Sequence, residues 1–167
     1  MVQFSQTSWQ EYSLSNVLET LSYVPMRVAI DTQPILYYTF PKNLAQGEII
    51  RYTLVAGFNK IRWTGIISAI SQEESSQITV RLHNGPFRGF TAKHQFEFDG
   101  ALTVCRDDMS FQGFSDFAEG DFAPLMKKAM LVYAIPSRIE ARDIILSVES
   151  KRQTQAFEAL DQSATAG

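Results

Sequence analysis

The sequence is poor in the residues on which most catalytic and metal-binding sites depend. Its 167 residues include one cysteine, Cys105, and two histidines, His83 and His94. A single cysteine excludes an internal disulfide, which is compatible with a reducing compartment. His83 is predicted to point outward and His94 inward, so the two do not make a metal site, and we expect neither a metal nor a cofactor. The sequence also lacks a Gly-x-Ser-x-Gly elbow, a Walker loop and a dinucleotide fingerprint.

Long apolar runs and a strong charge of one sign are absent as well. No run is long enough to span a bilayer, and the first residues lack the basic-then-apolar pattern of a signal peptide. The formal net charge of -3 gives no electrostatic reason to expect a nucleic acid or an anionic membrane as partner. We therefore expect a cytoplasmic location and no integral membrane segment. The length and composition predict one globular domain over residues 1–160, followed by a flexible tail at 161–167.

The segment from residue 87 to residue 111 predicts two strands joined by a tight turn. Asp99-Gly100 is typical of a two-residue type I′ turn, because that turn needs positive φ at both central residues. Such a turn places His94 opposite Cys105. One face of the hairpin then carries mostly aromatic and aliphatic side chains, with His94 and Asp107 as its polar groups. An aromatic inner face with so few polar groups indicates a ligand-binding cavity rather than an enzyme active site.

Further strands surround this hairpin in the sequence. Alternation of apolar and polar residues predicts strands at 48–56 and 60–70, joined by the short turn 57–59, with Tyr52 opposite Gly65. The opposite, outward face of this pair carries Arg51, Thr53, Arg62, Thr64 and Ser68. Additional strands are predicted at 2–9, 33–40 and 77–84, with one or two short helices between the first two of these.

After residue 114 the apolar spacing becomes helical. Pro136 should interrupt this helix, because proline lacks the amide hydrogen and clashes with the preceding turn. Ser137 and Glu140 resemble a new capping box, and Ile144, Ile145 and Val148 continue an apolar stripe. The order of elements predicts an α+β fold, in which a curved antiparallel sheet of six or seven strands wraps on a long C-terminal helix. A tunnel or pocket is expected between the sheet and this helix.

Several short motifs within residues 33–114 match one family. Gly85-Pro86-Phe87 stands at the turn before the aromatic strand, His94 and Phe96 take a His-x-Phe place, and Asp107 takes an Asp place that is followed by Met109-Ser110-Phe111 instead of Val-x-Tyr. These motifs resemble the START-like (SRPBCC, Bet v1-like) superfamily of hydrophobic-ligand-binding proteins, which includes polyketide cyclase/dehydrase and coenzyme Q-binding relatives. Ala92 departs from the pattern, since relatives often have another histidine there. The resemblance implies a helix-grip fold, and because the superfamily contains binders, carriers and a few enzymes it does not decide the function.

Three functions of different classes remain open. The first is a carrier or sensor that binds a hydrophobic small molecule such as a lipid, a quinone or a polyketide. The second is a polyketide cyclase/dehydratase-type enzyme in which His94 and Asp107 form an acid/base pair. The third is a protein-interaction module with a filled cavity, which would expose apolar patches around Val55, Phe58 and Ile66.

The residues predicted to line the cavity share an inward position on the strands or on the C-terminal helix. Each of them alone is better explained as part of a packed core. Cys105 is not expected to act as a nucleophile, because a buried sheet cysteine without a cationic neighbour keeps a high pKa. The predicted ligand-binding residues are Tyr52, Trp63, Phe90, His94, Phe96, Asp107, Met109, Phe111, Met126 and Met130.

Overall fold

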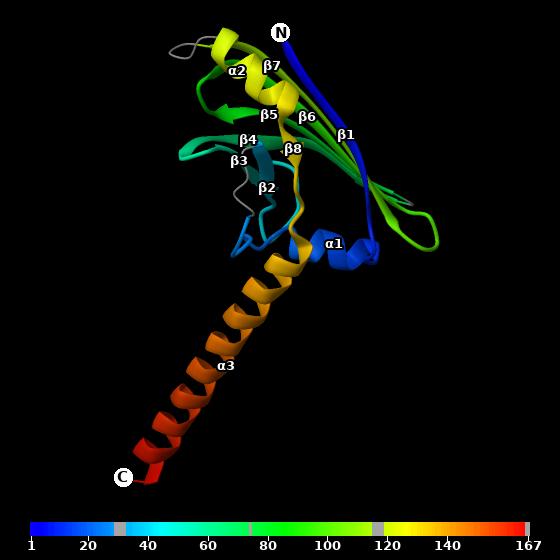
Figure 1. Cartoon of the computed structure of the whole chain (residues 1–167). Helices are drawn as coiled ribbons and strands as arrows, with labels where there is room; N and C mark the ends of the chain where they lie inside the picture. Colours follow the sequence, from blue (N-terminus) through cyan, green and yellow to red (C-terminus); the bar gives the residue numbers. More distant parts are fainter. Residues whose placement is uncertain (29–32, 74, 115–118, 166–167) are drawn as a thin grey trace.

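The computed structural model describes residues 1–28, 33–73, 75–114 and 119–165 (Figure 1). The elements follow one another as β1 (Val2–Gln10), α1 (Leu14–Thr20), β2 (Ile35–Thr39), β3 (Ile49–Ala56), β4 (Asn59–Gln72), β5 (Ser76–Asn84), β6 (Phe87–Phe98), β7 (Thr103–Phe114), α2 (Glu119–Lys128), β8 (Met130–Leu131) and α3 (Ile135–Thr165). The predicted α+β class is confirmed, with one short helix after the first strand.

The strands form one curved sheet in the order β1-β7-β6-β5-β4-β3-β2-β8. Neighbouring strands are antiparallel, except that β8 runs parallel to β2. The sheet has eight strands where six or seven were predicted, and β8 is only two residues long. The alternating residues of the long strands place one continuous apolar face on the inside of the curve.

The two ends of the sheet are joined through β8. The side-chain amide of Gln6, on β1, donates to the carbonyl of Leu131 at 2.9 Å, and its side-chain oxygen accepts from the amide of Leu131 at 3.0 Å. On its other side, β8 pairs with β2, where the amide of Val132 donates to the carbonyl of Leu36 at 2.9 Å. The Gln6 side chain therefore takes the place of backbone hydrogen bonds between β1 and β8. This contact joins the two edges of the curved sheet, which forms a near-barrel.

The C-terminal helix differs from the prediction in where it lies. The chain leaves the helical state at Lys128, passes through β8 and restarts as α3, with Pro136 in the first turn, where its missing amide hydrogen breaks no helical bond. Ile135, Arg138 and Ala141 of α3 are buried, whereas its described residues from 143 onward are exposed. Figure 1 shows α3 pointing away from the sheet.

The elements that cover the inner face of the sheet therefore differ from those predicted. Phe122 and Met126 of α2 and Leu131 of β8 are buried against this face and occupy the place predicted for the long helix. α3 reaches Thr165, and flexibility of residues 161–167 stays a prediction. Within the part of the chain that is described, no helix is both long enough and apolar enough to cross a membrane.

Both predicted hairpin registers are wrong by two residues. His94 pairs with Asp107 rather than Cys105, and Tyr52 pairs with Trp63 rather than Gly65. In the β6–β7 hairpin the Asp99 carboxylate accepts from the backbone amides of the two residues after Gly100, at 3.0 and 2.8 Å, which makes the loop longer. These bonds also lower the pKa of Asp99. A shift of two residues keeps every side chain on its predicted face, so His94 points inward as predicted.

Candidate functional site

A group of five polar side chains lies inside the near-barrel, and we call it the polar cluster: Tyr38, Tyr52, His94, Asp107 and Tyr133. The Asp107 carboxylate accepts from the Tyr38 hydroxyl at 2.8 Å, from Nδ1 of His94 at 2.7 Å and from the Tyr133 hydroxyl. Nε2 of His94 lies 2.8 Å from the Tyr52 hydroxyl. The sequence predicted that His94 and Asp107 would lie together, and neither Tyr38 nor Tyr133 is among the site residues that it predicted.

Each side chain of the polar cluster has a hydrogen-bond partner within the cluster. With Nδ1 of His94 donating to Asp107, Nε2 is left to accept from the Tyr52 hydroxyl, so both ring nitrogens have a partner. Burial raises the pKa values of Tyr38, Tyr52 and Tyr133 well above the ordinary value of 10.0, and the negative charge of Asp107 raises them further. A buried network in which every member is satisfied stabilises one arrangement of the core.

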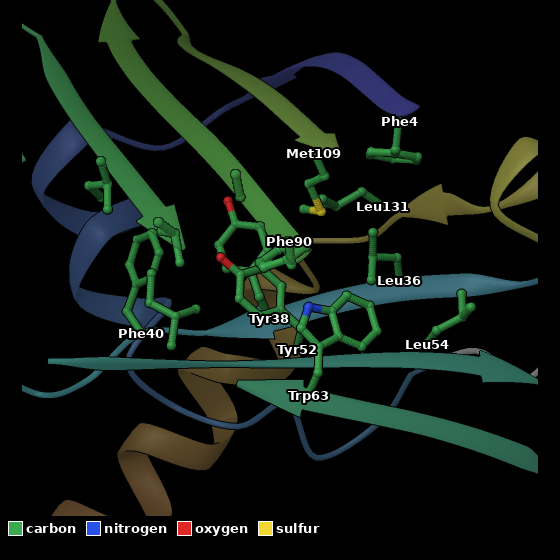
Figure 2. Close-up of a cluster of buried hydrophobic side chains, with 14 of the residues drawn as sticks. Phe4, Leu36, Tyr38, Phe40, Tyr52, Leu54, Trp63, Phe90, Met109 and Leu131 are labelled. Carbon is green, nitrogen blue, oxygen red and sulfur yellow. The ribbon is translucent and has the colours of Figure 1, made fainter. Parts of the chain in front are cut away.

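The predicted ligand-binding residues are, with one exception, packed against one another. Nine of the ten are at most 3% exposed. The ring of Tyr52 stacks on Trp63 with centroids 5.4 Å apart, and Phe90 meets Tyr52 edge-on at 5.0 Å (Figure 2). Met130 is 45% exposed, because it lies on β8 instead of the predicted helix. A ligand-binding role for these residues stays a prediction.

Cys105 is fully buried in the core, and in the described part of the chain the groups that act on the pKa of its thiol are Asp107 and Tyr133 rather than a cation. Burial raises the pKa of its thiol to about 12, and the negative charge of Asp107 adds to the effect. Because the thiolate is the nucleophilic form, a thiol with this pKa is unreactive near neutral pH.

Arg138 is a buried charged residue that the sequence did not predict to be important. Its guanidinium is fully buried and donates to the carbonyls of Leu21, Tyr23, Tyr38 and Tyr133. Burial lowers its pKa to about 10. These bonds tie the start of α3 to β2 and to the segment after α1, which indicates a structural role. No sequence signal distinguished Arg138 from the other charged residues after Pro136.

The outer face of β2, β3 and β4 carries a pocket of about 500 Å³, which we call the outer pocket. The pairing of these strands sets two rows of side chains side by side, Tyr37–Thr53–Arg62 and Thr39–Arg51–Thr64. All six residues line the pocket, and Val24 adds an apolar wall. The sequence predicted the outward direction of most of these side chains but carried no signal for a pocket.

The outer pocket contains two nearly buried threonines and two arginines that form no ion pair with another described residue. Thr39 and Thr53 are each 7% exposed, although they lie on the outer face. Arg51 and Arg62 are exposed, and neither forms an ion pair with any carboxylate among the residues that the structure describes. The arrangement can therefore hold an anionic group beside the apolar surfaces of Val24 and Tyr37.

Comparison with known proteins yields structural likeness alone. No protein-family model matches the chain, and no curated protein matches it significantly. Among solved structures it is similar to ginseng major latex-like protein 151 from Panax ginseng, at 10% identity and a TM-score of 0.43, with 85% of this chain and 98% of that chain covered.

Two bacterial structures are similar to a comparable degree. TTHA0849 from Thermus thermophilus is 12% identical with a TM-score of 0.45, over 83% of this chain and 92% of that chain. The protein CC1736 from Caulobacter crescentus is 14% identical with a TM-score of 0.41, over 93% and 99% of the two chains. At these scores the START-like resemblance reaches no further than the architecture described above, a curved antiparallel sheet and a long C-terminal helix.

Proposed function

We propose that this protein is a non-catalytic binding protein that takes up a small amphipathic anion in the outer pocket. The ligand class is an apolar or aromatic body that carries one carboxylate, phosphate or sulfonate group. The observation that carries the proposal is the pair of guanidinium groups, Arg51 and Arg62, which border the pocket and pair with no carboxylate in the described residues.

The chemistry of the lining favours this ligand class. A guanidinium offers a planar fork of donors that matches the oxygens of a carboxylate or phosphate. Val24 and Tyr37 supply apolar and aromatic surface beside the two arginines, as small-molecule sites require. The volume of about 500 Å³ suits a ligand of drug-like size. Because the two rows of side chains stand on paired strands, the site is largely preformed.

The geometry gives less support to a cyclase/dehydratase-type enzyme and to a ligand held in the interior. A substrate of a polyketide cyclase/dehydratase-type enzyme would have to displace Tyr38 or Tyr52 to reach His94 and Asp107, which are at most 1% exposed. A lipid, quinone or polyketide in the interior would have to displace the packed aromatic rings. The outer pocket has no histidine or carboxylate among its described lining residues, so it offers no general base.

The experiment compares two fluorescent dyes of similar size and different charge. The anionic dye is 1-anilinonaphthalene-8-sulfonate, and the neutral dye is N-phenyl-1-naphthylamine. We expect Arg51→Gln and Arg62→Gln each to weaken binding of the anionic dye about tenfold, which is the loss of one charge-assisted hydrogen bond. The same substitutions should leave the neutral dye unaffected. Arg81→Gln, an exposed residue on β5 outside the pocket, is the matched control and should change neither.

Two results would contradict the proposal. Equal affinity of the anionic dye for the wild-type protein and both pocket variants would exclude Arg51 and Arg62 as its binding groups. Turnover of an aromatic polyketide substrate that is lost in His94→Ala, with the fold intact, would make the protein an enzyme and place its site in the polar cluster.

A further inference from the structure

The tip of the β3–β4 hairpin and the segment after α1 expose apolar side chains side by side. Phe58, in the hairpin turn, is 107% exposed relative to its reference, Val24 is 60% exposed and Met26 is 49% exposed. A hollow of about 560 Å³ is lined by Met26 and Phe58 together, so the two segments lie next to each other. Single exposed apolar side chains are common on protein surfaces, whereas neighbouring ones that form a patch mark a surface for a protein or a membrane.

The same region gathers positive charge. Arg27 and Lys60 line this hollow, and Arg51 and Arg62 line the outer pocket, which shares Tyr37 with it. None of the lining residues described for either hollow carries a carboxylate. Nor does any of the four cations take part in an ion pair with another described residue. We call this surface the tip face: Val24, Met26, Arg27, Arg51, Phe58, Lys60 and Arg62.

We propose that the tip face docks on an anionic lipid bilayer. Phe58 and Met26 would insert at the level of the headgroups, and the surrounding cations would lie against the lipid phosphates. The formal net charge of -3 does not oppose this, because a charge beyond a Debye length of about 8–10 Å is screened and the local cations dominate the contact. The proposal goes beyond ligand binding and requires no ligand in the outer pocket.

Two features favour a bilayer over a protein as the occupant. Phe58 protrudes from the turn of a hairpin, and a protruding apolar side chain inserts readily into a fluid interface, whereas a protein partner would need a matching pocket. The charged groups of the tip face also have one sign only, which complements the negative surface of a membrane rich in acidic lipids.

The test measures co-sedimentation of the full chain with vesicles of two compositions. One is phosphatidylcholine alone, and the other is phosphatidylcholine with about one third phosphatidylserine, a negatively charged lipid. We expect binding to the second composition, weakened by added salt because charge screening reduces the attraction. Phe58→Ala should weaken binding about tenfold, from the lost apolar insertion. Lys60→Gln should weaken it about fivefold, the effect of one cation near the membrane surface.

The chain offers a matched control for each variant. Phe98, at the end of β6 in another hairpin, is 46% exposed and lies outside the tip face, so Phe98→Ala should leave vesicle binding unchanged. Lys151 lies on the exposed part of α3, so Lys151→Gln is the control for Lys60→Gln and should also leave vesicle binding unchanged.

Three results would overturn the proposal. One is equal binding to both vesicle compositions, and another is an equal loss of binding in a variant and its control. The third is no binding to either composition, and a change in the association state of Phe58→Ala on size-exclusion chromatography would then assign the tip face to a protein interface. Because the dye experiment uses no vesicles, failure here leaves the ligand proposal standing, and the reverse also holds.

Discussion

Replacing Asp107 by alanine should be among the most damaging single changes in this protein. Asp107 is 1% exposed, and its carboxylate is the acceptor for Tyr38, His94 and Tyr133. Asp107→Ala leaves these donors in the core without an acceptor. A buried donor without a partner costs about 1–3 kcal/mol, so the three together set an upper range of about 3–9 kcal/mol.

Two effects reduce this range. The substitution also removes the desolvation penalty of a buried carboxylate, and the freed hydroxyl groups can rotate toward other acceptors. We therefore expect a loss of about 3–5 kcal/mol in the free energy of unfolding, which is a large part of the ~5–15 kcal/mol typical of a domain. Asp107→Asn should cost less, about 1–3 kcal/mol, since its amide oxygen can still accept from Tyr38 and His94, which both donate to Oδ1.

Urea unfolding followed by tryptophan fluorescence and by circular dichroism measures these differences. Asp108→Ala is the matched control, because Asp108 is the next residue, is exposed on the outer face and accepts from Ser5 at the surface. Its substitution should change the free energy of unfolding by less than about 1 kcal/mol. A loss below about 1 kcal/mol for Asp107→Ala would refute the reasoning, since the polar cluster would then not be a buried, closed network.

Further predictions concern the polar cluster and the packing around it. The pKa values of the three tyrosines in the polar cluster are raised well above 10.0 in the folded protein. Above pH 10 the unfolded chain therefore loses phenolic protons that the folded chain keeps. The free energy of unfolding is then fully present below pH 10 and falls as the pH rises above it. Urea titrations at increasing pH should show a slope of up to about 4 kcal/mol per pH unit. Gly65→Ala should lower stability by about 1–3 kcal/mol in thermal unfolding, because the new Cβ would lie 2.3 Å from Cγ1 of Val80. Phe96→Ala, which empties a fully buried site, should cost about 3–5 kcal/mol in urea, and a smaller loss would indicate a cavity wall. Cys105 should react with a thiol reagent only as fast as the chain unfolds, and rapid labelling of the native protein would contradict its burial.

The hairpins show which part of a sheet can be predicted from alternation. Apolar residues at every second position assigned His94 to the inner face and Arg62 to the outer face, and both assignments are confirmed. The register was wrong in both hairpins because a slip by two residues leaves every face unchanged. In the β6–β7 hairpin the Asp99 side chain accepts from two backbone amides, and these bonds stabilise a longer loop than the predicted two-residue turn. The longer loop shifts the register by two residues.

The C-terminal region shows what alternation and helical spacing cannot reveal. Met126 and Tyr133 lie at helical spacing, yet the chain between them forms β8. That strand exists because it pairs with β2 and because Gln6, 125 positions away from Leu131, bonds to its backbone. Nothing in the local sequence encodes a partner so distant.

The sequence by itself determined the α+β class, the long strands, the inward direction of His94 and Asp107 and the start of a new helix near Pro136, although α3 begins at Ile135 and not at the predicted cap Ser137. These features depend on neighbouring residues, through periodicity and turn chemistry, so they can be predicted locally. Only the tertiary structure decided that β8 closes the sheet, that inward side chains such as Tyr52 and Trp63 are buried against one another, and that α3 points away from the sheet. It also decided that four cations gather on one face of a chain whose formal net charge is -3. Closure and charge clustering depend on which distant residues meet in space, and a one-dimensional pattern does not contain that information.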